Sequence, residues 1–436
     1  MNVRQIALRI LMEYEAAGKF INLALSSHMT DRLSREEKAA LTALLYTTVE
    51  RKLSYDYYIC ALSGRSLSEI EPHTQNILRL GLCQILDMQS IPDFAAVNES
   101  VKLASTPGER SFVNGLLRAA VRRKENMPMP PREKNYRRYL SVKYSFPLAT
   151  VKHFDSLFGQ ESTERMLDFF NNTKYLDITV NTKRISVEGY LKLLTTAGLS
   201  PETNKIAPIS IRLWGSVNPE RLPGFSEGFF FVQDRASCIS AYTLDPEGCG
   251  LIVDVCAAPG GKSFAAGVLS KGEAKIHAFD LHESKLSLIC SGAQRLGLDS
   301  IEPAVRDALF PDESLISKAD RVICDAPCSG LGVLGKKPDL RYKDVSAAEE
   351  LTTLQLDIIK ASSKYLKIGG YMVYSTCTLN PLENEQIVKQ FLGENPNFEL
   401  TPFTVGDISA DSGMLTLLPH VHLTDGFFMA KIKRII

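Results

Sequence analysis

Two cysteines stand where they could act as nucleophiles. Cys328 follows the apolar run at 322–324, and Cys377 follows the apolar run at 371–375. A cysteine thiolate is a soft nucleophile that can form a covalent intermediate. Both runs are predicted strands, and ligands of open α/β sheets bind outside the carboxyl ends of the strands. We therefore expect both thiols to face one crevice, although strand-end placement does not say which of them attacks.

The segment 251–263, LIVDVCAAPGGKS, is predicted to be an apolar strand, a small glycine-bearing turn and a helix. Small residues let the backbone approach a ligand, and the start of a helix offers unpaired N–H donors. The dinucleotide fingerprint fails because Cys256 and Ala258 replace its first two glycines, and a Walker A loop fails because Cys256 replaces its first glycine. The cofactor that remains is S-adenosylmethionine, with S-adenosylhomocysteine as its product.

Carboxylates at successive strand ends support this cofactor. Asp280 ends the second strand, 26 residues after Asp254, and there it could accept both ribose hydroxyls. Asp307 follows the third strand, where its side chain could contact the adenine amine. One such carboxylate alone would usually be a helix cap. No histidine or second cysteine pair lies at ligand spacing, so we expect no metal.

Length and composition indicate a multidomain globular protein. The 436 residues are 44% hydrophobic and 23% charged, with equal numbers of basic and acidic residues. No run approaches the roughly 18 apolar residues of a membrane span. The N-terminal segment carries Glu13 and Glu15 where a signal peptide needs an apolar core. We expect a cytoplasmic, monomeric protein with free thiols and no membrane contact.

Three regions are predicted. Residues 1–130 form a helical domain, in which Ser34 and Glu37 make a capping box before an apolar helix face and the proline-rich segment 127–131 ends the domain. Residues 136–235 form a small α+β domain with strands near 176–181 and 209–213 around a helix near 187–197. Residues 236–436 alternate strands and helices, which predicts a doubly wound α/β domain that ends in an antiparallel hairpin near 420–433. Its strands are expected at 251–255, 275–279, 302–305, 321–324 and 371–375.

A basic stripe straddles the first boundary. Ten basic and two acidic residues lie between Arg110 and Lys143, a balance of plus eight. Such a stripe is typical of a surface that binds a polyanion, although a solvated helix end and linker would look the same. The candidate RNA contacts of this stripe and of the loop after Cys328 are Arg118, Arg122, Arg123, Lys336, Lys337 and Arg341.

Three strings closely resemble the central motifs of the NOL1/NOP2/Sun family of RNA cytosine-5 methyltransferases: DVCAAPGGKS at 254–263, DAPCSG at 325–330 and STCT at 375–378. Outside them, VNESV at 97–101 and FVNGLLR at 112–118 resemble the NusB-type helical domain of one bacterial branch. The resemblance covers essentially the whole chain. It implies an all-α NusB-like domain, a small α+β domain and a Rossmann-like methyltransferase domain.

The resemblance also implies a role for each motif residue. Cys377 would be the nucleophile, Cys328 would assist product release, and Asp325 would hold the base and stabilise the adduct, with Lys262 beside them. The cofactor would be held by Cys256, Ala257, Ala258, Pro259, Gly260, Gly261, Lys262, Asp280, Asp307 and Asp325. The substrate would be 16S rRNA, methylated at cytosine 967. This sequence departs from its relatives at Leu331 and at Gly335, Lys336 and Lys337, where they often carry threonine and a basic run with histidine.

Two other functions remain open at this point. The NusB-like part also fits an RNA-binding, antitermination-like assembly factor whose methyltransferase domain is inactive, although both cysteines and the acidic strand ends are retained. An amino-group methyltransferase would carry an aromatic residue after Asp-Pro-Pro or Asn-Pro-Pro, and the segment Asp325–Cys328 has none.

Overall fold

A computed structural model describes residues 2–17, 21–28, 33–172, 174–343 and 348–436. The chain divides into two compact units, of which the first is Met1–Asn171 with Leu334–Lys343 and the second is Asn172–Val333 with Asp344–Ile436. Within the described ranges, no helix has the length and apolar character needed to cross a bilayer.

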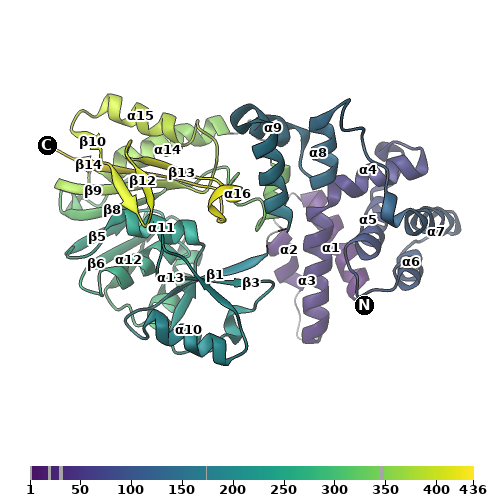
Figure 1. The fold of residues 1–436 in the computed structure, drawn as a ribbon, viewed down its shortest axis with the longest axis horizontal. Helices are drawn as coiled ribbons and strands as arrows, with labels where there is room; N and C mark the ends of the chain where they lie inside the picture. Colours follow the sequence, from purple (N-terminus) through teal and green to yellow (C-terminus); the bar gives the residue numbers. More distant parts are fainter. Residues whose placement is uncertain (1, 18–20, 29–32, 173, 344–347) are drawn as a thin grey trace. The chain divides into compact units, whose positions relative to one another are not determined.

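The first unit is helical (Figure 1). Its elements are α1 (Val3–Ala17), α2 (Ile21–His28), α3 (Arg35–Glu50), α4 (Lys52–Ser63), η1 (Leu67–Glu69), α5 (Pro72–Leu86), α6 (Asp93–Val101), α7 (Pro107–Arg122), η2 (Lys124–Asn126), α8 (Tyr136–Tyr144), α9 (Leu148–Asn172) and η5 (Pro338–Tyr342). The predicted capping box is present, since Ser34 accepts from the Glu37 N–H while Glu37 accepts from the Ser34 N–H. The predicted apolar face is buried at Leu41, Leu44, Leu45, Thr48 and Val49.

The compact unit extends beyond the boundary predicted at 131. The Ser54 hydroxyl on α4 donates to the Val142 carbonyl on α8 at 2.5 Å, and the Leu53 N–H donates to the Ser145 hydroxyl at 3.1 Å. Because these contacts join α4 to α8, the helices after the proline-rich segment pack with the N-terminal helices. The division between the two units therefore falls after Asn171.

The second unit begins with the small α+β region. Its elements are β1 (Tyr175–Val180), α10 (Val187–Thr196), β2 (Pro201–Thr203), β3 (Ser210–Trp214), η3 (Pro219–Arg221) and β4 (Phe230–Val232). The strands form an antiparallel sheet in the order β2-β3-β1-β4. Ile178, Ile211 and Phe230 of the sheet pack against Tyr190 and Leu194 of α10 in one apolar core. The predicted strand–helix–strand pattern is confirmed.

A mixed eight-stranded sheet follows, with the path β10-β14-β9-β8-β5-β6-β7 and β13 beside β14. Its strands are β5 (Leu251–Asp254), β6 (Lys275–Asp280), β7 (Ile301–Val305), β8 (Ala319–Asp325), β9 (Leu366–Thr376), β10 (Phe398–Leu400), β13 (Met414–Leu417) and β14 (Phe427–Arg434). The five predicted strands are confirmed as β5, β6, β7, β8 and β9, which pair in parallel. The remaining elements are α11 (Arg235–Leu244), α12 (Gly261–Leu269), α13 (Glu283–Leu296), η4 (Glu313–Leu315), α14 (Ala348–Ser363), α15 (Glu385–Glu394), β11 (Phe403–Val405), β12 (Ile408–Ala410) and α16 (Pro419–His422).

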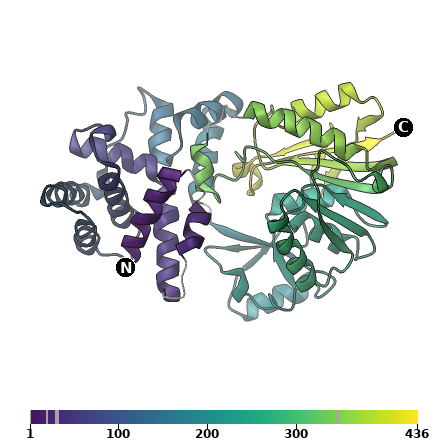
Figure 2. The same cartoon turned by 180° about the vertical axis from the view of Figure 1, so that it is seen from behind.

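Helices cover both faces of this sheet (Figures 1 and 2). Successive side chains of a strand point to opposite faces. Ile252 of β5 accordingly lies in one core with α11, α12 and α13, whereas its neighbour Val253 lies in another core with α14 and α15. The chain runs from β5 through β6 to β7 on one side, and β8 pairs with the other edge of β5. That reversal places a crevice beyond the carboxyl ends of β5 and β8.

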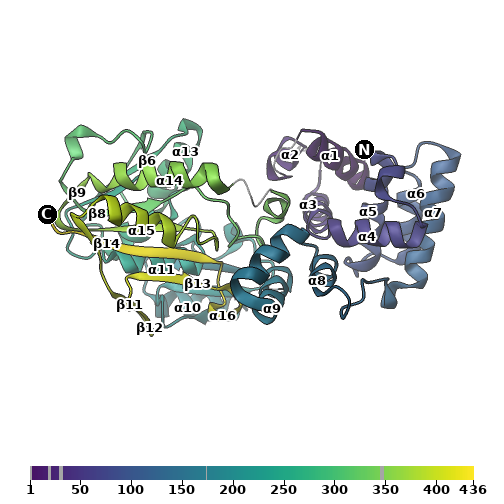
Figure 3. The ribbon, with the colours of Figure 1, turned by 90° about the horizontal axis from the view of Figure 1, so that it is seen from above.

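The predicted C-terminal hairpin is present but begins earlier than expected. β13 pairs antiparallel with β14 from Met414 opposite Ala430 to Leu417 opposite Phe427 (Figure 3). The predicted start near His420 is wrong, because residues 419–422 form the short helix α16 after a proline that suits a helix start.

Candidate active site

A cavity of about 340 Å³ opens at the carboxyl ends of the parallel strands. It gathers side chains that are up to 122 positions apart, because parallel strand ends meet at one edge of the sheet. The predicted site residues that line it are Cys256, Ala258, Asp280, Asp307, Asp325, Cys328 and Cys377. Leu281, His282 and Lys285 complete the wall beside Asp280. The predicted convergence of both thiols on one crevice is confirmed.

The turn after β5 is held by the neighbouring strand end. The Ala257 N–H donates to the Phe279 carbonyl at 2.7 Å, and the Ala258 N–H donates to Asp280 Oδ2 at 3.2 Å. Asp280 Oδ1 accepts from the His282 N–H at 3.0 Å. Asp280 is therefore fixed from both sides while it remains part of the cavity wall.

Five predicted cofactor residues do not line the cavity: Ala257, Pro259, Gly260, Gly261 and Lys262. Gly260 has a φ of 111°, and a Cβ there would lie 2.4 Å from the Phe264 ring. Only glycine fits both demands, so the turn stays close to the ring and leads directly into α12. A turn of small residues, a helix start and two strand-end carboxylates fit an amino-acid–nucleoside ligand such as S-adenosylmethionine.

Asp325 at the end of β8 is held by a cation and a hydroxyl. Lys262 Nζ lies 2.6 Å from Asp325 Oδ2, and the Ser375 hydroxyl donates to Asp325 Oδ1 at 2.8 Å. Burial alone would lower the pKa of Lys262, but the Asp325 carboxylate, with smaller contributions from Asp254 and Cys377, offsets it and the pKa is raised. Lys262 is therefore a fixed cation at the base of the site.

The two thiols form a pair. Cys328 Sγ and Cys377 Sγ are 3.3 Å apart, and both residues are free cysteines that are partly exposed to the cavity. The hydrogen bond with Cys377 and burial raise the pKa of Cys328 well above its ordinary value. Cys377 in turn raises the pKa of Lys262, which means that the Lys262 cation favours a thiolate on Cys377. One proton shared by the pair is therefore best placed on Cys328.

Asp254 at the end of β5, to which the sequence assigned no role, directly precedes Val255 and Cys256 of the cavity wall. It is buried, it accepts a hydrogen bond from the Ser263 hydroxyl at 2.6 Å, and its Oδ1 atom has no partner among the described residues. Burial raises the pKa of Asp254 to about 7. Its position before the glycine-bearing turn was visible in the sequence, but its burial was not.

No group of three or more histidine, cysteine or acidic side chains within the described part of the chain could hold a metal ion.

Comparisons with known proteins agree with this geometry. Residues 241–433 match the family described as 16S rRNA methyltransferase RsmB/F, residues 1–122 match the NusB family, and residues 146–219 match the ferredoxin-like domain of RsmF/B-like methyltransferases. The chain is 35% identical over the full length of both proteins to the probable ribosomal RNA small subunit methyltransferase B of Synechocystis. It belongs to the RsmB family of rRNA methyltransferases.

Further relatives agree. The chain is 33% identical to the probable ribosomal RNA small subunit methyltransferase B of Bacillus subtilis, with 99% of each chain covered. A crystal structure of a methyltransferase homologue from Pyrococcus horikoshii superposes with a TM-score of 0.59 at 26% identity, covering 68% of this chain and 98% of that one. Membership of the RsmB family confirms the predicted enzyme class, an rRNA methyltransferase that depends on S-adenosylmethionine. The three family matches also confirm the predicted fold, which is an all-α NusB-like domain, a small α+β domain and a Rossmann-like methyltransferase domain.

Most of the candidate RNA contacts are exposed. In the helical unit these are Arg118, Arg122 and Arg123, together with Lys336 and Lys337 of Leu334–Lys343, the inserted segment of that unit. Arg341 is the exception and is withdrawn from this set. Its side chain is buried, with Nε donating to the Leu334 carbonyl at 3.1 Å and the guanidinium 4.0 Å from the centre of the Phe146 ring.

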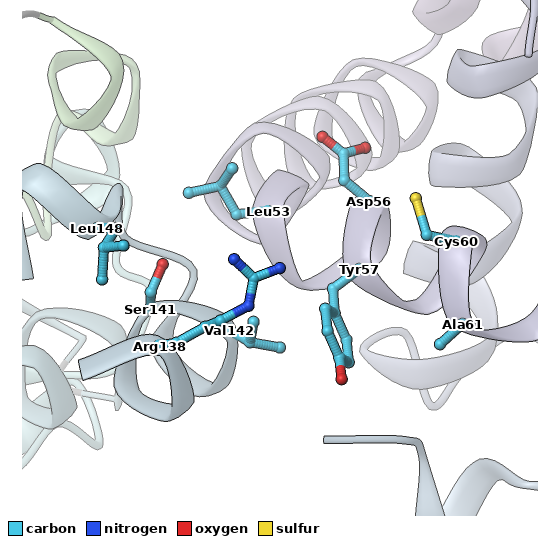
Figure 4. A pocket seen from close by; sticks show the side chains of 9 residues that line it. All are labelled: Leu53, Asp56, Tyr57, Cys60, Ala61, Arg138, Ser141, Val142 and Leu148. Atoms are coloured by element: carbon cyan, nitrogen blue, oxygen red, sulfur yellow. The ribbon is translucent and has the colours of Figure 1, made fainter. Parts of the chain in front are cut away.

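The helical unit of this family member has a cavity of its own, of about 510 Å³, between α4, α8 and the start of α9. Its lining residues are Leu53, Asp56, Tyr57, Cys60, Ala61, Arg138, Ser141, Val142 and Leu148. Arg138, a member of the basic stripe, reaches from α8 toward Tyr57 and Asp56 (Figure 4). This cavity has no strand-end carboxylates and no thiol pair, so we assign the chemistry to the cavity of the second unit.

Proposed function

We propose that this protein methylates carbon 5 of a cytosine in 16S rRNA, cytosine 967 by resemblance, through a covalent adduct between Cys377 and carbon 6 of the base. The observation that carries the proposal is the thiol pair, 3.3 Å between sulfurs, in one cavity with three strand-end carboxylates. An amino-group methyltransferase would not need either thiol. Family membership supports the methyl transfer, and the thiols support the choice of carbon 5.

The cofactor would occupy the cavity beside Asp280 and Asp307. Asp280 would accept the ribose hydroxyls, Asp307 would lie near the adenine amine, and the turn 256–262 would lie along the rest of the molecule. S-adenosylmethionine supplies an electrophilic methyl group and leaves as S-adenosylhomocysteine. Fixation of Asp280 by the Ala258 and His282 N–H groups prepares this wall before the ligand arrives.

The thiols would act on the cytosine. Carbon 5 is a poor nucleophile until a soft nucleophile adds at carbon 6, and the Cys377 thiolate would make that bond. Asp325 would hold the N3 and N4 edge of the base and stabilise the adduct, with Lys262 holding Asp325 in place. After the methyl group is transferred, a base such as water takes the carbon 5 proton, the electrons of that bond re-form the carbon 5–carbon 6 double bond, and the Cys377–carbon 6 bond breaks to return the Cys377 thiolate. Cys328, at 3.3 Å, is placed to assist that release.

The substrate would be unpaired RNA, because a stacked and paired cytosine hides carbon 6. The phosphates of the RNA would be contacted by Arg118, Arg122 and Arg123 of the helical unit and by Lys336 and Lys337 of the inserted segment. We also propose that the protein works as a cytoplasmic monomer.

Incubation with tritiated S-adenosylmethionine and unmodified 16S rRNA tests the proposal. We expect label in the RNA, and nuclease mapping should place it on 5-methylcytosine. Label on an exocyclic amine would support the amino-group reaction instead. No label, with RNA binding intact, would support the alternative of an RNA-binding assembly factor with an inactive methyltransferase domain.

A further inference from the structure

Glu383 is a fully buried carboxylate directly before Asn384, the N-cap residue of α15. Its oxygens accept four hydrogen bonds, whose donors are the Ser329 N–H at 2.8 Å, the Ser329 hydroxyl at 2.5 Å, Gln355 Nε2 at 3.0 Å and Asn380 Nδ2 at 3.1 Å, and the Thr378 hydroxyl oxygen lies 3.5 Å away. No lysine or arginine among the described residues forms an ion pair with it. A buried charge held only by neutral donors is costly, which suggests that it has a role.

The donors come from both cysteine-bearing loops. Ser329 directly follows Cys328, and Thr378 directly follows Cys377. Because the Ser329 proton goes to Glu383, the Thr378 hydroxyl donates its proton to the Ser329 hydroxyl at 2.7 Å. Glu383 thus fixes the loop after Cys328 through Ser329, and the loop after Cys377 through Asn380 and the Thr378–Ser329 bond.

A backbone contact closes the same junction. The Gly332 N–H donates to the Cys377 carbonyl at 2.9 Å. A Cβ on Gly332 would lie 1.9 Å from the Gly426 carbonyl oxygen and 2.8 Å from the Cys377 carbonyl oxygen. Only glycine permits this approach, so the loop after Cys328 lies directly against Cys377.

We propose that Glu383 is a positioning residue that joins the two cysteine-bearing loops and keeps the shared proton on Cys328, so that Cys377 carries the thiolate. The inference rests on the proposed function, since it explains how two neighbouring thiols take different roles. Glu383 does not line the cavity and acts through Ser329 and Thr378.

The charges around the pair support this division. After the hydrogen bond with Cys377, burial and the charge of Cys377 itself, the carboxylates of Glu383 and Asp325 also raise the pKa of Cys328. The cation of Lys262 interacts instead with Cys377. Glu383 bonds twice to Ser329, the residue after Cys328, and the Lys262 cation interacts with Cys377, so the two thiols experience unequal charges, which favours a single arrangement of the proton.

The test is the order in which the two thiols are alkylated. The full-length protein, without RNA or S-adenosylmethionine, is treated with less than one equivalent of iodoacetamide near neutral pH, and peptide mass spectrometry gives the ratio of modified Cys377 to modified Cys328. Because only a thiolate reacts, we expect Cys377 to dominate in the wild type. Glu383→Gln should lower the ratio about tenfold, which corresponds to one pKa unit between the thiols.

Two further variants make the test specific. Glu385→Gln is the matched control, because it makes the same change two positions away in a side chain that bonds to Thr416 and to neither cysteine loop. Its ratio should equal that of the wild type. Glu383→Asp keeps the charge with a shorter reach, so it should retain most of the Cys377 preference, and it carries the test if Glu383→Gln does not fold.

The outcomes are distinct. An unchanged ratio in Glu383→Gln, a wild type in which Cys328 reacts first, or a folded Glu383→Asp that loses the preference would each overturn the role of Glu383. None of these results depends on methyl transfer. A failure of the proposed cytosine reaction would therefore appear in the labelling assay and leave the alkylation ratio intact.

Discussion

The two cavities of this protein contain the same three kinds of side chain in different arrangements. The three kinds are a cysteine, an aspartate and a basic residue. In the helical unit these are Cys60, Asp56 and Arg138, all of which line the cavity; in the second unit Cys377 and Asp325 line the cavity and the basic residue is Lys262, which is ion-paired with Asp325. In the second unit the lysine is ion-paired with the aspartate at 2.6 Å and its charge reaches the thiol. The basic residue therefore acts on the group that would react.

In the helical unit the aspartate is engaged elsewhere. Asp56 Oδ1 lies 2.6 Å from Nε of the buried Arg79, and no ion pair links Asp56 to Arg138 within the described residues. Burial and then the Asp56 charge raise the pKa of Cys60, which keeps it a thiol. Residue types alone therefore do not make a nucleophile. A thiol becomes a nucleophile when a cation is placed to stabilise its thiolate form. The following substitutions test this difference between the two cavities.

The largest difference should come from removing each cysteine. Cys377→Ala should abolish methyl transfer to 16S rRNA, since no group remains to add at carbon 6. Cys60→Ala should leave the rate unchanged, because a thiol held in its protonated form takes no part. Both rates are measured with tritiated S-adenosylmethionine. If Cys377→Ala retained activity, Cys377 would be no more necessary for methyl transfer than Cys60, and the proposed difference between the cavities would be wrong.

The cation should matter next. Lys262→Gln should lower kcat/KM about a hundredfold, the usual cost of losing one electrostatic contact to a reacting group. Lys271→Gln is the control, since Lys271 is exposed and pairs with Glu247 away from the cavity. If both variants had the same rate, the link between Lys262 and the thiol would be refuted.

The buried carboxyl group of Asp254 in the second unit should also affect how the stability of the protein depends on pH. The pKa of Asp254 in the folded protein, about 7, lies above its unfolded value. Its stabilising contribution to the free energy of unfolding is therefore fully present below about pH 4 and is lost as the pH rises through 7. As the pH rises from about 5 to about 8, the free energy of unfolding of Asp254→Asn should therefore increase relative to that of the wild type by on the order of 2 kcal/mol. Thermal unfolding of both proteins at both pH values measures this change. If the stability difference between variant and wild type were the same at both pH values, the raised pKa of Asp254 would be refuted.

The smallest effect should come from the helical cavity. Arg138→Ala should weaken RNA binding slightly and reduce the slope of log affinity against log salt by about one, because one phosphate contact is lost. The rate at saturating RNA should not change. A fall in that rate would give the helical cavity a part in the chemistry.

Much of the site could be predicted because strand ends are predictable. Cys328 and Cys377 follow apolar runs with a clear strand pattern, and the carboxyl ends of parallel strands must share an edge. The helical face after Ser34 was equally visible, since a capping box and a 3.6-residue period are local features. Local signals therefore fixed both the elements and the edge where the chemistry lies.

The contacts that depend on distant residues could not be predicted. Arg341 looked like one more basic residue of an exposed loop, yet it is buried on Phe146 and donates to the Glu50 carbonyl, 291 positions away. Glu383 gave no signal either, because its burial and its donor Ser329, 54 positions away, appear only in the folded chain. Which thiol attacks was likewise left to resemblance, and the fixed charges around the pair now supply a physical reason.

The most direct test of the account is to map the covalent bond between protein and RNA. A Cys328→Ala variant incubated with S-adenosylmethionine and 16S rRNA should accumulate an adduct, because release is impaired while addition is not. Proteolysis and mass spectrometry should place the RNA on Cys377, and Cys377→Ala should give no adduct even with 5-fluorocytosine RNA. An adduct that persisted in Cys377→Ala and disappeared in Cys328→Ala would contradict the account and exchange the two roles.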